Sequence, residues 1–180
     1  MVKTFKFRPL EDSGRFFIGI DVGMTGAVSV INAKGELMSC CRMPVCKYGK
    51  RTEINITDFS RLFKIKGKVM SVIVEEVYAF GMGRTSAFSF GKNQGMILGV
   101  VQTLRLPTKR ITPQEWQKVM LAGLPRKDKT KESANKKAIY LFPELEDILD
   151  VKANQGIADA SLMAEYGRLM YSRGSRGFLK

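Results

Sequence analysis

The stretch FIGIDVG at residues 17–23 decides the fold. Its apolar first half predicts a buried strand over residues 16–21, and the Asp-x-Gly that follows predicts a tight turn at the end of that strand. The strand therefore ends at a carboxylate, Asp21. Because charged side chains are rarely buried unless they are paired or bound to a metal, Asp21 is either a turn residue or part of a site.

Two later apolar segments carry acidic residues in a similar way. VIVEEV at residues 72–77 predicts a central strand that ends at Glu75 and Glu76, and GIADA at residues 156–160 predicts the start of a helix that contains Asp159. Taken alone, Glu75 could be paired with a lysine, and Asp159 could be an ordinary helix-start residue. The three segments together, in this order, predict a site built from carboxylates.

The charge of the chain indicates a polyanionic partner. Its 30 Lys and Arg against 17 Asp and Glu give a formal net charge of +13, which favours nucleic acid over an anionic membrane surface. It contains no histidine, which excludes Ser-His-Asp and Cys-His triads and any histidine-bound metal. Carboxylate chemistry, lysine chemistry and a hard cation held by oxygen atoms remain.

The length of 180 residues predicts one folded domain, over residues 16–172, between a basic N-terminal arm at residues 1–15 and a basic tail at residues 173–180. No apolar run approaches the roughly 20 residues of a membrane span. Basic residues also interrupt the N-terminal segment where a secretion signal would be apolar. We therefore expect a cytoplasmic protein that is neither secreted nor bound to a membrane.

The periodicity of the chain predicts an α/β domain. Strands are expected at residues 16–21, 27–31, 37–42, 69–74 and 108–111, and helices from Thr57, over residues 85–104, from Pro113, and over residues 131–141 and 156–170. Residues 44–56 are expected to be a polar loop. This order matches an RNase H-like domain, a five-stranded mixed sheet flanked by helices, in which right-handed crossovers place the first and fourth strands side by side and parallel.

That pairing would bring Asp21 and Glu75 to the same end of strands about 4.8 Å apart. Two carboxylates so close cannot both stay ionised at low cost without a cation, and Asp159 could supply a third. Mg²⁺ prefers oxygen ligands and keeps bound water, and a pair of such ions can clamp the attacking and leaving oxygens of a phosphoryl displacement. The arrangement predicts metal-dependent phosphodiester chemistry with water as the nucleophile.

Glycines recur every four residues in the helix expected over residues 85–104, at Gly91, Gly95 and Gly99. Each would cost about 1 kcal/mol relative to alanine in a solvated helix. The resulting smooth ridge predicts close packing against another helix, either within the chain or from a second subunit.

These motifs resemble the RuvC family of Holliday-junction resolvases over residues 16 to about 168. The resemblance rests on GIDVG at residues 19–23, VEEVY at 74–78, SAFSFGKNQG at 86–95 and ADA at 158–160. PQEWQK at residues 113–118 and KES at residues 131–133 resemble the phage and organellar branches of that family.

The resemblance implies a homodimer that binds a four-way DNA junction and nicks two strands symmetrically with Mg²⁺ or Mn²⁺, two ions being expected and no small-molecule cofactor. It implies the cytoplasm of a bacterium or a phage-infected cell. By motif position, Asp21, Glu75 and Asp159 are the implied catalytic metal ligands, and Glu76 is an implied supporting residue. The bacterial motif has a further aspartate where this chain has Gly156, so the fourth carboxylate is either missing or supplied from elsewhere. Gln155, which precedes that glycine, is a second candidate for a supporting role.

Aromatic and basic residues supply the expected DNA contacts. Rings on the loop after the glutamate pair can stack on unpaired bases at a branch point, or pack beneath the loop. The densest basic cluster, between residues 126 and 137, is expected to bind phosphates rather than to form only a solvated helix face, and two of its lysines could assist transition-state charge. The expected contacts are Tyr78, Phe80, Arg84, Lys92, Asn93, Lys127, Lys129, Lys131 and Lys136.

A structure-selective DNA endonuclease that resolves four-way junctions is the preferred interpretation. One alternative is an RNase H-like nuclease that acts on other branched DNA or on RNA–DNA hybrids. Another is a non-catalytic branched-DNA-binding protein, which the missing fourth carboxylate favours. IDVGMTG at residues 20–26 also resembles the first phosphate loop of the actin and sugar-kinase fold, but that fold uses a duplicated domain and a longer chain.

Overall fold

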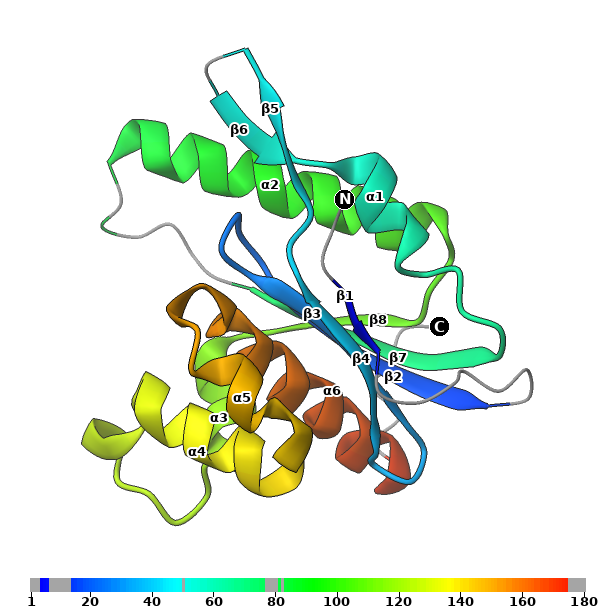
Figure 1. Cartoon of the computed structure of the whole chain (residues 1–180), viewed down its shortest axis with the longest axis vertical. Helices are drawn as coiled ribbons and strands as arrows, with labels where there is room; N and C mark the ends of the chain where they lie inside the picture. The colour runs from blue at the N-terminus through cyan, green and yellow to red at the C-terminus, as the bar shows by residue number, and fades with distance from the viewer. Residues whose placement is uncertain (1–3, 7–13, 50, 77–80, 82, 175–180) are drawn as a thin grey trace.

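A six-stranded mixed sheet forms the centre of the molecule (Figure 1). The computed structural model describes residues 4–6, 14–49, 51–76, 81 and 83–174. The strands lie in the order β1 (Thr4–Lys6), β4 (Leu37–Arg42), β3 (Ala27–Asn32), β2 (Arg15–Asp21), β7 (Lys68–Glu75) and β8 (Thr108–Ile111). The predicted α/β class with a mixed sheet is confirmed, but the predicted count of five strands is wrong. β1, expected within an irregular arm, pairs antiparallel with β4 because Phe5 packs against the core.

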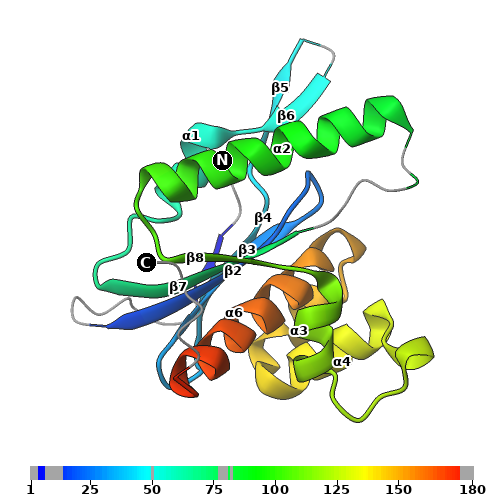
Figure 2. The same ribbon diagram turned by 180° about the vertical axis from the view of Figure 1, so that it is seen from behind.

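Helices cover both faces of the sheet (Figures 1 and 2). One face carries α1 (Ile56–Arg61) and α2 (Arg84–Thr103), and the other carries α3 (Pro113–Met120), α4 (Lys131–Leu141), α5 (Glu146–Leu149) and α6 (Gly156–Ser172). Alternate residues of a strand point to opposite faces, so the sheet separates two cores. Ile18 and Ile20 of β2 belong to the core with α2, and Phe17 belongs to the core with α6.

The central pairing is the predicted one. β2 and β7 are parallel, with Ile18 opposite Val72 and Ile20 opposite Val74. Parallel neighbours end at the same edge of a sheet, so the residues that follow these pairs, Asp21 and Glu75, lie at one edge.

Helix α6 packs against β2 with almost no side chain between the two backbones. A Cβ atom at Gly19 would lie 2.0 Å from the carbonyl oxygen of Ala160 and 2.6 Å from the amide nitrogen of Ala164. Only a glycine at this strand position permits the approach. The approach fixes the first turn of α6 at the edge of the sheet where Asp21 ends its strand.

The connection after β4 differs from the prediction of a polar loop over residues 44–56. β5 (Val45–Tyr48) and β6 (Arg51–Ile54) form an antiparallel two-stranded ribbon there. Every residue of β5 is exposed, so the ribbon lacks the apolar face that would have marked a strand in the sequence.

Two further boundaries differ. α1 begins after Asn55, whose side chain accepts a hydrogen bond from the Asp58 amide at 3.1 Å, rather than at the predicted cap Thr57. The connection expected between α4 and α6 contains α5 and two 3₁₀ turns, η2 (Pro143–Leu145) and η3 (Lys152–Asn154). Over the described ranges, the helices are too short or too polar to cross a membrane.

Candidate active site

Three carboxylates from separate elements come together at one edge of the sheet. Asp21 ends β2, Glu75 ends β7, and Asp159 lies in the first turn of α6. Burial raises the pKa of Asp21 well above its ordinary value, and the charges of Glu75 and Asp159 raise it further. Burial, and then the charge of Glu75, raises the pKa of Asp159 to about 6. The charge of Glu75 raises the pKa of both aspartates, as expected for side chains that lie at the same edge of the sheet.

An open cleft of about 630 Å³ gives access to this region. Asp21 and Asp159 line it, together with the basic side chains of Arg42, Lys131 and Lys152. Carboxylates surrounded by basic side chains suit a phosphodiester substrate. The basic side chains attract its negative charge, and the carboxylates stay available to bind a metal ion.

The carboxylates have the donor chemistry of a site for a hard divalent cation. Oxygen atoms of carboxylates are preferred ligands of Mg²⁺ and Mn²⁺, and buried carboxylates that oppose one another's ionisation gain from a cation between them. Within the described part of the chain, no group of three or more His, Cys, Asp or Glu side chains is gathered closely enough to hold an ion. The residues therefore fit such a cation by chemistry, and binding would have to draw them closer together.

A hydrogen bond that the sequence did not predict holds Glu75. Trp116 of α3 is 1% exposed and donates its Nε1–H to Glu75 Oε1 at 2.9 Å. Burial raises the pKa of Glu75, and this hydrogen bond lowers it. A capping motif fixes α3 at its start, where the Thr112 amide donates to Glu115 Oε2 at 2.7 Å. A buried indole N–H needs an acceptor, so the sequence could have indicated that Trp116 has a hydrogen-bond partner. No local sequence pattern identifies that partner as Glu75.

Lys131 brings positive charge to the same region. It begins α4 and lines the cleft, and its charge lowers the pKa of both Asp21 and Asp159. The helix start is fixed by Thr130, whose Oγ1 accepts a hydrogen bond from the Ser133 amide at 3.3 Å. Lys131 is thus placed where it can offset negative charge beside the carboxylates.

Gly156 stands where the family resemblance implies a fourth carboxylate, and it has no room for a side chain. A Cβ atom there would lie 2.8 Å from Asp21 Oδ2 and 2.8 Å from the carbonyl oxygen of Thr25. The preceding residue, Gln155, lines the cleft. Asn154 is buried and donates to a main-chain carbonyl at 2.8 Å. An amide, Gln155, is therefore the polar group that this segment offers to the cleft.

Glu76 lies toward the neighbouring strand. Its Oε1 is 3.1 Å from Arg110 Nη1, and its amide donates to the Ile111 carbonyl at 2.7 Å. The ion pair ties Glu76 to β8, and its role as a supporting residue stays a prediction.

The expected DNA contacts near the start of α2 have different environments. Tyr78 and Phe80 lie outside the described residues. Arg84 is exposed at the first position of α2. Lys92 forms an ion pair of 2.7 Å with a glutamate of β6. Asn93 is 8% exposed, on the side of α2 that faces the sheet, and its role in binding DNA stays a prediction.

Among the described residues, only some of the lysines in the basic cluster around α4 are free of other contacts and so available to bind phosphate. Lys127 is exposed. Lys129 donates from Nζ to a main-chain carbonyl of α3 at 3.3 Å. Lys136 is exposed and forms an ion pair of 2.6 Å with a glutamate one helical turn earlier, a weak contact that phosphate could replace.

Comparisons with known proteins support the fold. No protein-family model matches the chain, and no curated protein matches its sequence. A solved structure of Thermus thermophilus RuvC is 15% identical with a TM-score of 0.51, over 88% of this chain and 96% of the RuvC chain. T. thermophilus RuvC in complex with a Holliday junction substrate is 17% identical with a TM-score of 0.55, over 89% and 97% of the two chains. The chain is therefore similar in fold to RuvC over nearly the whole length of both proteins.

Proposed function

We propose that the protein is a structure-selective DNA endonuclease that resolves four-way junctions by metal-dependent phosphodiester hydrolysis. The observation that carries the proposal is the position of Asp21, Glu75 and Asp159 at one sheet edge, where Asp21 and Asp159 line a basic-rimmed cleft. The fold similarity to RuvC, which has been solved with a Holliday junction substrate, supports DNA as the polyanion. The segments PQEWQK and KES favour the phage and organellar branch of that family, and we expect the protein to act in the cytoplasm.

Each residue of the centre has a role in this reaction. Asp21, Glu75 and Asp159 would hold Mg²⁺ or Mn²⁺, two ions being expected, which when bound supply an activated water and neutralise charge on the phosphate. Trp116 holds one oxygen of Glu75 and so orients the other. Lys131 is placed to stabilise the negative charge that develops on the phosphate oxygens.

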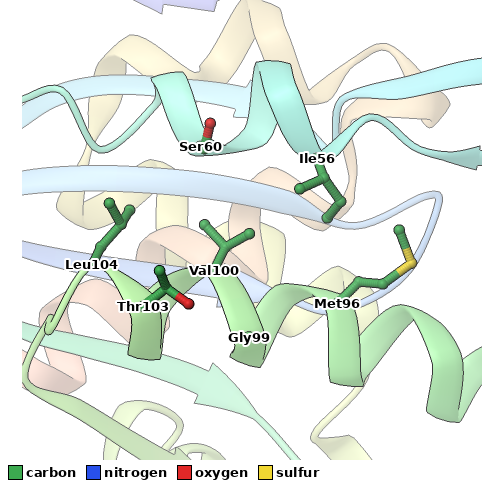
Figure 3. A pocket seen from close by; sticks show the side chains of 7 residues that line it. All are labelled: Ile56, Ser60, Met96, Gly99, Val100, Thr103 and Leu104. Carbon is green, nitrogen blue, oxygen red and sulfur yellow. The ribbon is translucent and has the colours of Figure 1, made fainter.

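A homodimer would supply the second centre that paired nicks require. Gly91, Gly95 and Gly99 are exposed, and a Cβ atom at any of them would meet no other atom within 4 Å, so their ridge packs against nothing inside the described chain. An apolar groove of about 320 Å³ lies beside it, between α1 and α2, and Figure 3 shows Ile56 and Val100 on its two sides. The lack of an internal helix partner among the described residues supports a second subunit as the partner of this ridge.

Cleavage of a labelled immobile four-way junction, beside a linear duplex of matched sequence, tests the function. With Mg²⁺ and then Mn²⁺, the wild type should make paired nicks on opposing strands of the junction and leave the duplex intact. Asp21→Asn should bind the junction and not cleave it. Equal cleavage of junction and duplex, or of an RNA–DNA hybrid in preference to both, would contradict a resolvase and favour a different RNase H-like nuclease.

A non-catalytic binder of branched DNA is the second candidate. It is favoured by Gly156, which leaves the site without a fourth carboxylate, and by the lack of a closely gathered ligand cluster among the described residues. Calorimetric titration with Mn²⁺ separates the two. Binding heat that disappears in Asp21→Asn supports the enzyme, and tight junction binding with no such heat supports the binder.

A further inference from the structure

We infer that the β5–β6 ribbon is a DNA-binding arm that contacts the phosphate backbone of a duplex as it leaves the carboxylate cleft. The inference rests on the proposed function and adds a contact surface to it. Figures 1 and 2 show the ribbon projecting past α2, away from the sheet. All four residues of β5 are exposed, and Tyr48 at its end is 76% exposed.

The base of the ribbon is fixed to the body of the molecule. Ile54 is buried, and the Asn55 amide donates to the Pro44 carbonyl at 2.9 Å, which closes the two strands. Glu53 of β6 forms an ion pair with Lys92 of α2 at 2.7 Å. An isolated two-stranded hairpin is only marginally stable in water, so these anchors are what hold an exposed ribbon in one direction.

One face of the ribbon continues the wall of the cleft. Val45 lines the cleft together with Asp21 and Asp159. Side chains two residues apart point to the same face of a strand, so Lys47 lies on the face of Val45, one step farther out. A backbone that enters the cleft can therefore follow Arg42, at the cleft wall, to Lys47 on the ribbon.

The charge of the ribbon suits a phosphate backbone. Lys47 and Arg51 are exposed near its end, and Tyr48 lies directly opposite Arg51 in the register. Glu53, the acidic residue of the described ribbon strands, is already paired with a lysine. A two-stranded ribbon also has the width that a DNA major groove admits. Duplex DNA therefore matches both the charge and the width of the ribbon.

The test compares two charge reversals in the non-cleaving Asp21→Asn background. Lys47→Glu changes the ribbon, and Lys34→Glu makes the same change at an exposed position in the β3–β4 turn, at the opposite end of the sheet. Binding to a four-way junction and to a plain duplex is measured between about 50 and 200 mM salt. Over this range the affinity falls more steeply the more phosphate contacts the protein makes. We expect Lys47→Glu to weaken binding about fivefold or more and to reduce the salt slope by about one, whereas Lys34→Glu changes affinity less than about twofold.

The native thiol Cys46 gives an independent measurement without mutation. It is the exposed cysteine of the chain, on β5, while Cys40 and Cys41 are buried. Cys46 points to the face of β5 opposite Lys47, so saturating DNA bound along the Lys47 face should leave its alkylation by a maleimide largely unchanged, and strong protection would show that DNA covers the other face instead. Equal affinities of Lys47→Glu and Lys34→Glu, with circular dichroism showing both folded, would overturn the inference. Strong DNA binding by a wild type that cleaves nothing would remove the endonuclease proposal alone, because the comparison of the two variants needs binding and not cleavage.

Discussion

At the scale of single residues, the hydrogen bond from Trp116 to Glu75 carries the sharpest prediction. Trp116→Phe keeps an aromatic ring in the core and removes the N–H that lowers the pKa of Glu75. Hydrogen bonds to charged groups contribute about 1.5–3 kcal/mol, so we expect affinity for Mn²⁺ to fall roughly tenfold or more. Calorimetric titration measures this directly, and excess Mn²⁺ should restore much of the cleavage rate. Unchanged Mn²⁺ affinity in a folded variant would show that Trp116 only fills space.

The pKa of Asp159 predicts how stability depends on pH without metal. The pKa of about 6 in the folded state lies above the ordinary aspartate value of 3.8, so the folded state binds the proton more tightly than the unfolded state. This contribution to stability is fully present below about pH 4 and is lost as the pH rises through 6. Urea unfolding in EDTA should show Asp159→Asn losing less stability than the wild type between pH 4 and 7. Parallel curves for the two proteins would contradict the assignment.

The positions of the carboxylates at the strand ends were predictable from the sequence, whereas the residues that surround them were not. Asp21 and Glu75 end apolar strands, and a charge in such a position is visible without a structure. The Trp116 hydrogen bond joins residues 41 positions apart, and the crowding around Gly156 depends on how the start of α6 meets Asp21. Both depend on tertiary packing, which local sequence periodicity does not reveal.

At the scale of secondary-structure elements, the contact between β2 and α6 predicts the effect of one methyl group. Gly19→Ala would place a Cβ atom 2.0 Å from the Ala160 carbonyl oxygen, so α6 must shift away from the sheet. We expect a loss of about 1–3 kcal/mol or more in the free energy of unfolding, measured with urea, together with weaker Mn²⁺ binding because Asp159 moves with the helix. Ser89→Ala is the control, since Ser89 is exposed on α2, away from the glycine ridge, and alanine favours the helix. Equal stabilities of the two variants would contradict the close approach.

Elements with a buried face were predicted well. The ranges of β8 and α4 agree with the structure, and β2 differs by one residue, because apolar periodicity and capping residues mark them. The β5–β6 ribbon and β1 were missed for the opposite reason. The ribbon has no apolar face, and β1 is only three residues long at the edge of the sheet, so neither leaves a periodic signal.

At the scale of the whole molecule, the exposed glycine ridge predicts the oligomeric state. Gly95→Arg adds a long cation where a side chain has open space in the single chain, so the fold and its melting temperature should be preserved. On a helix that must approach a second copy closely, the same side chain would hold the two copies apart and leave its charge poorly solvated. We expect light scattering to give a dimer for the wild type at micromolar concentration and a monomer for Gly95→Arg. The variant should also lose paired nicking while keeping single nicks, because each centre is complete within one chain.

Gln114→Arg, on the exposed side of α3, is the matched control and should remain a dimer. A wild type that is monomeric both alone and on junction DNA would contradict the ridge as an interface, and paired nicks would then have to come from two independent binding events.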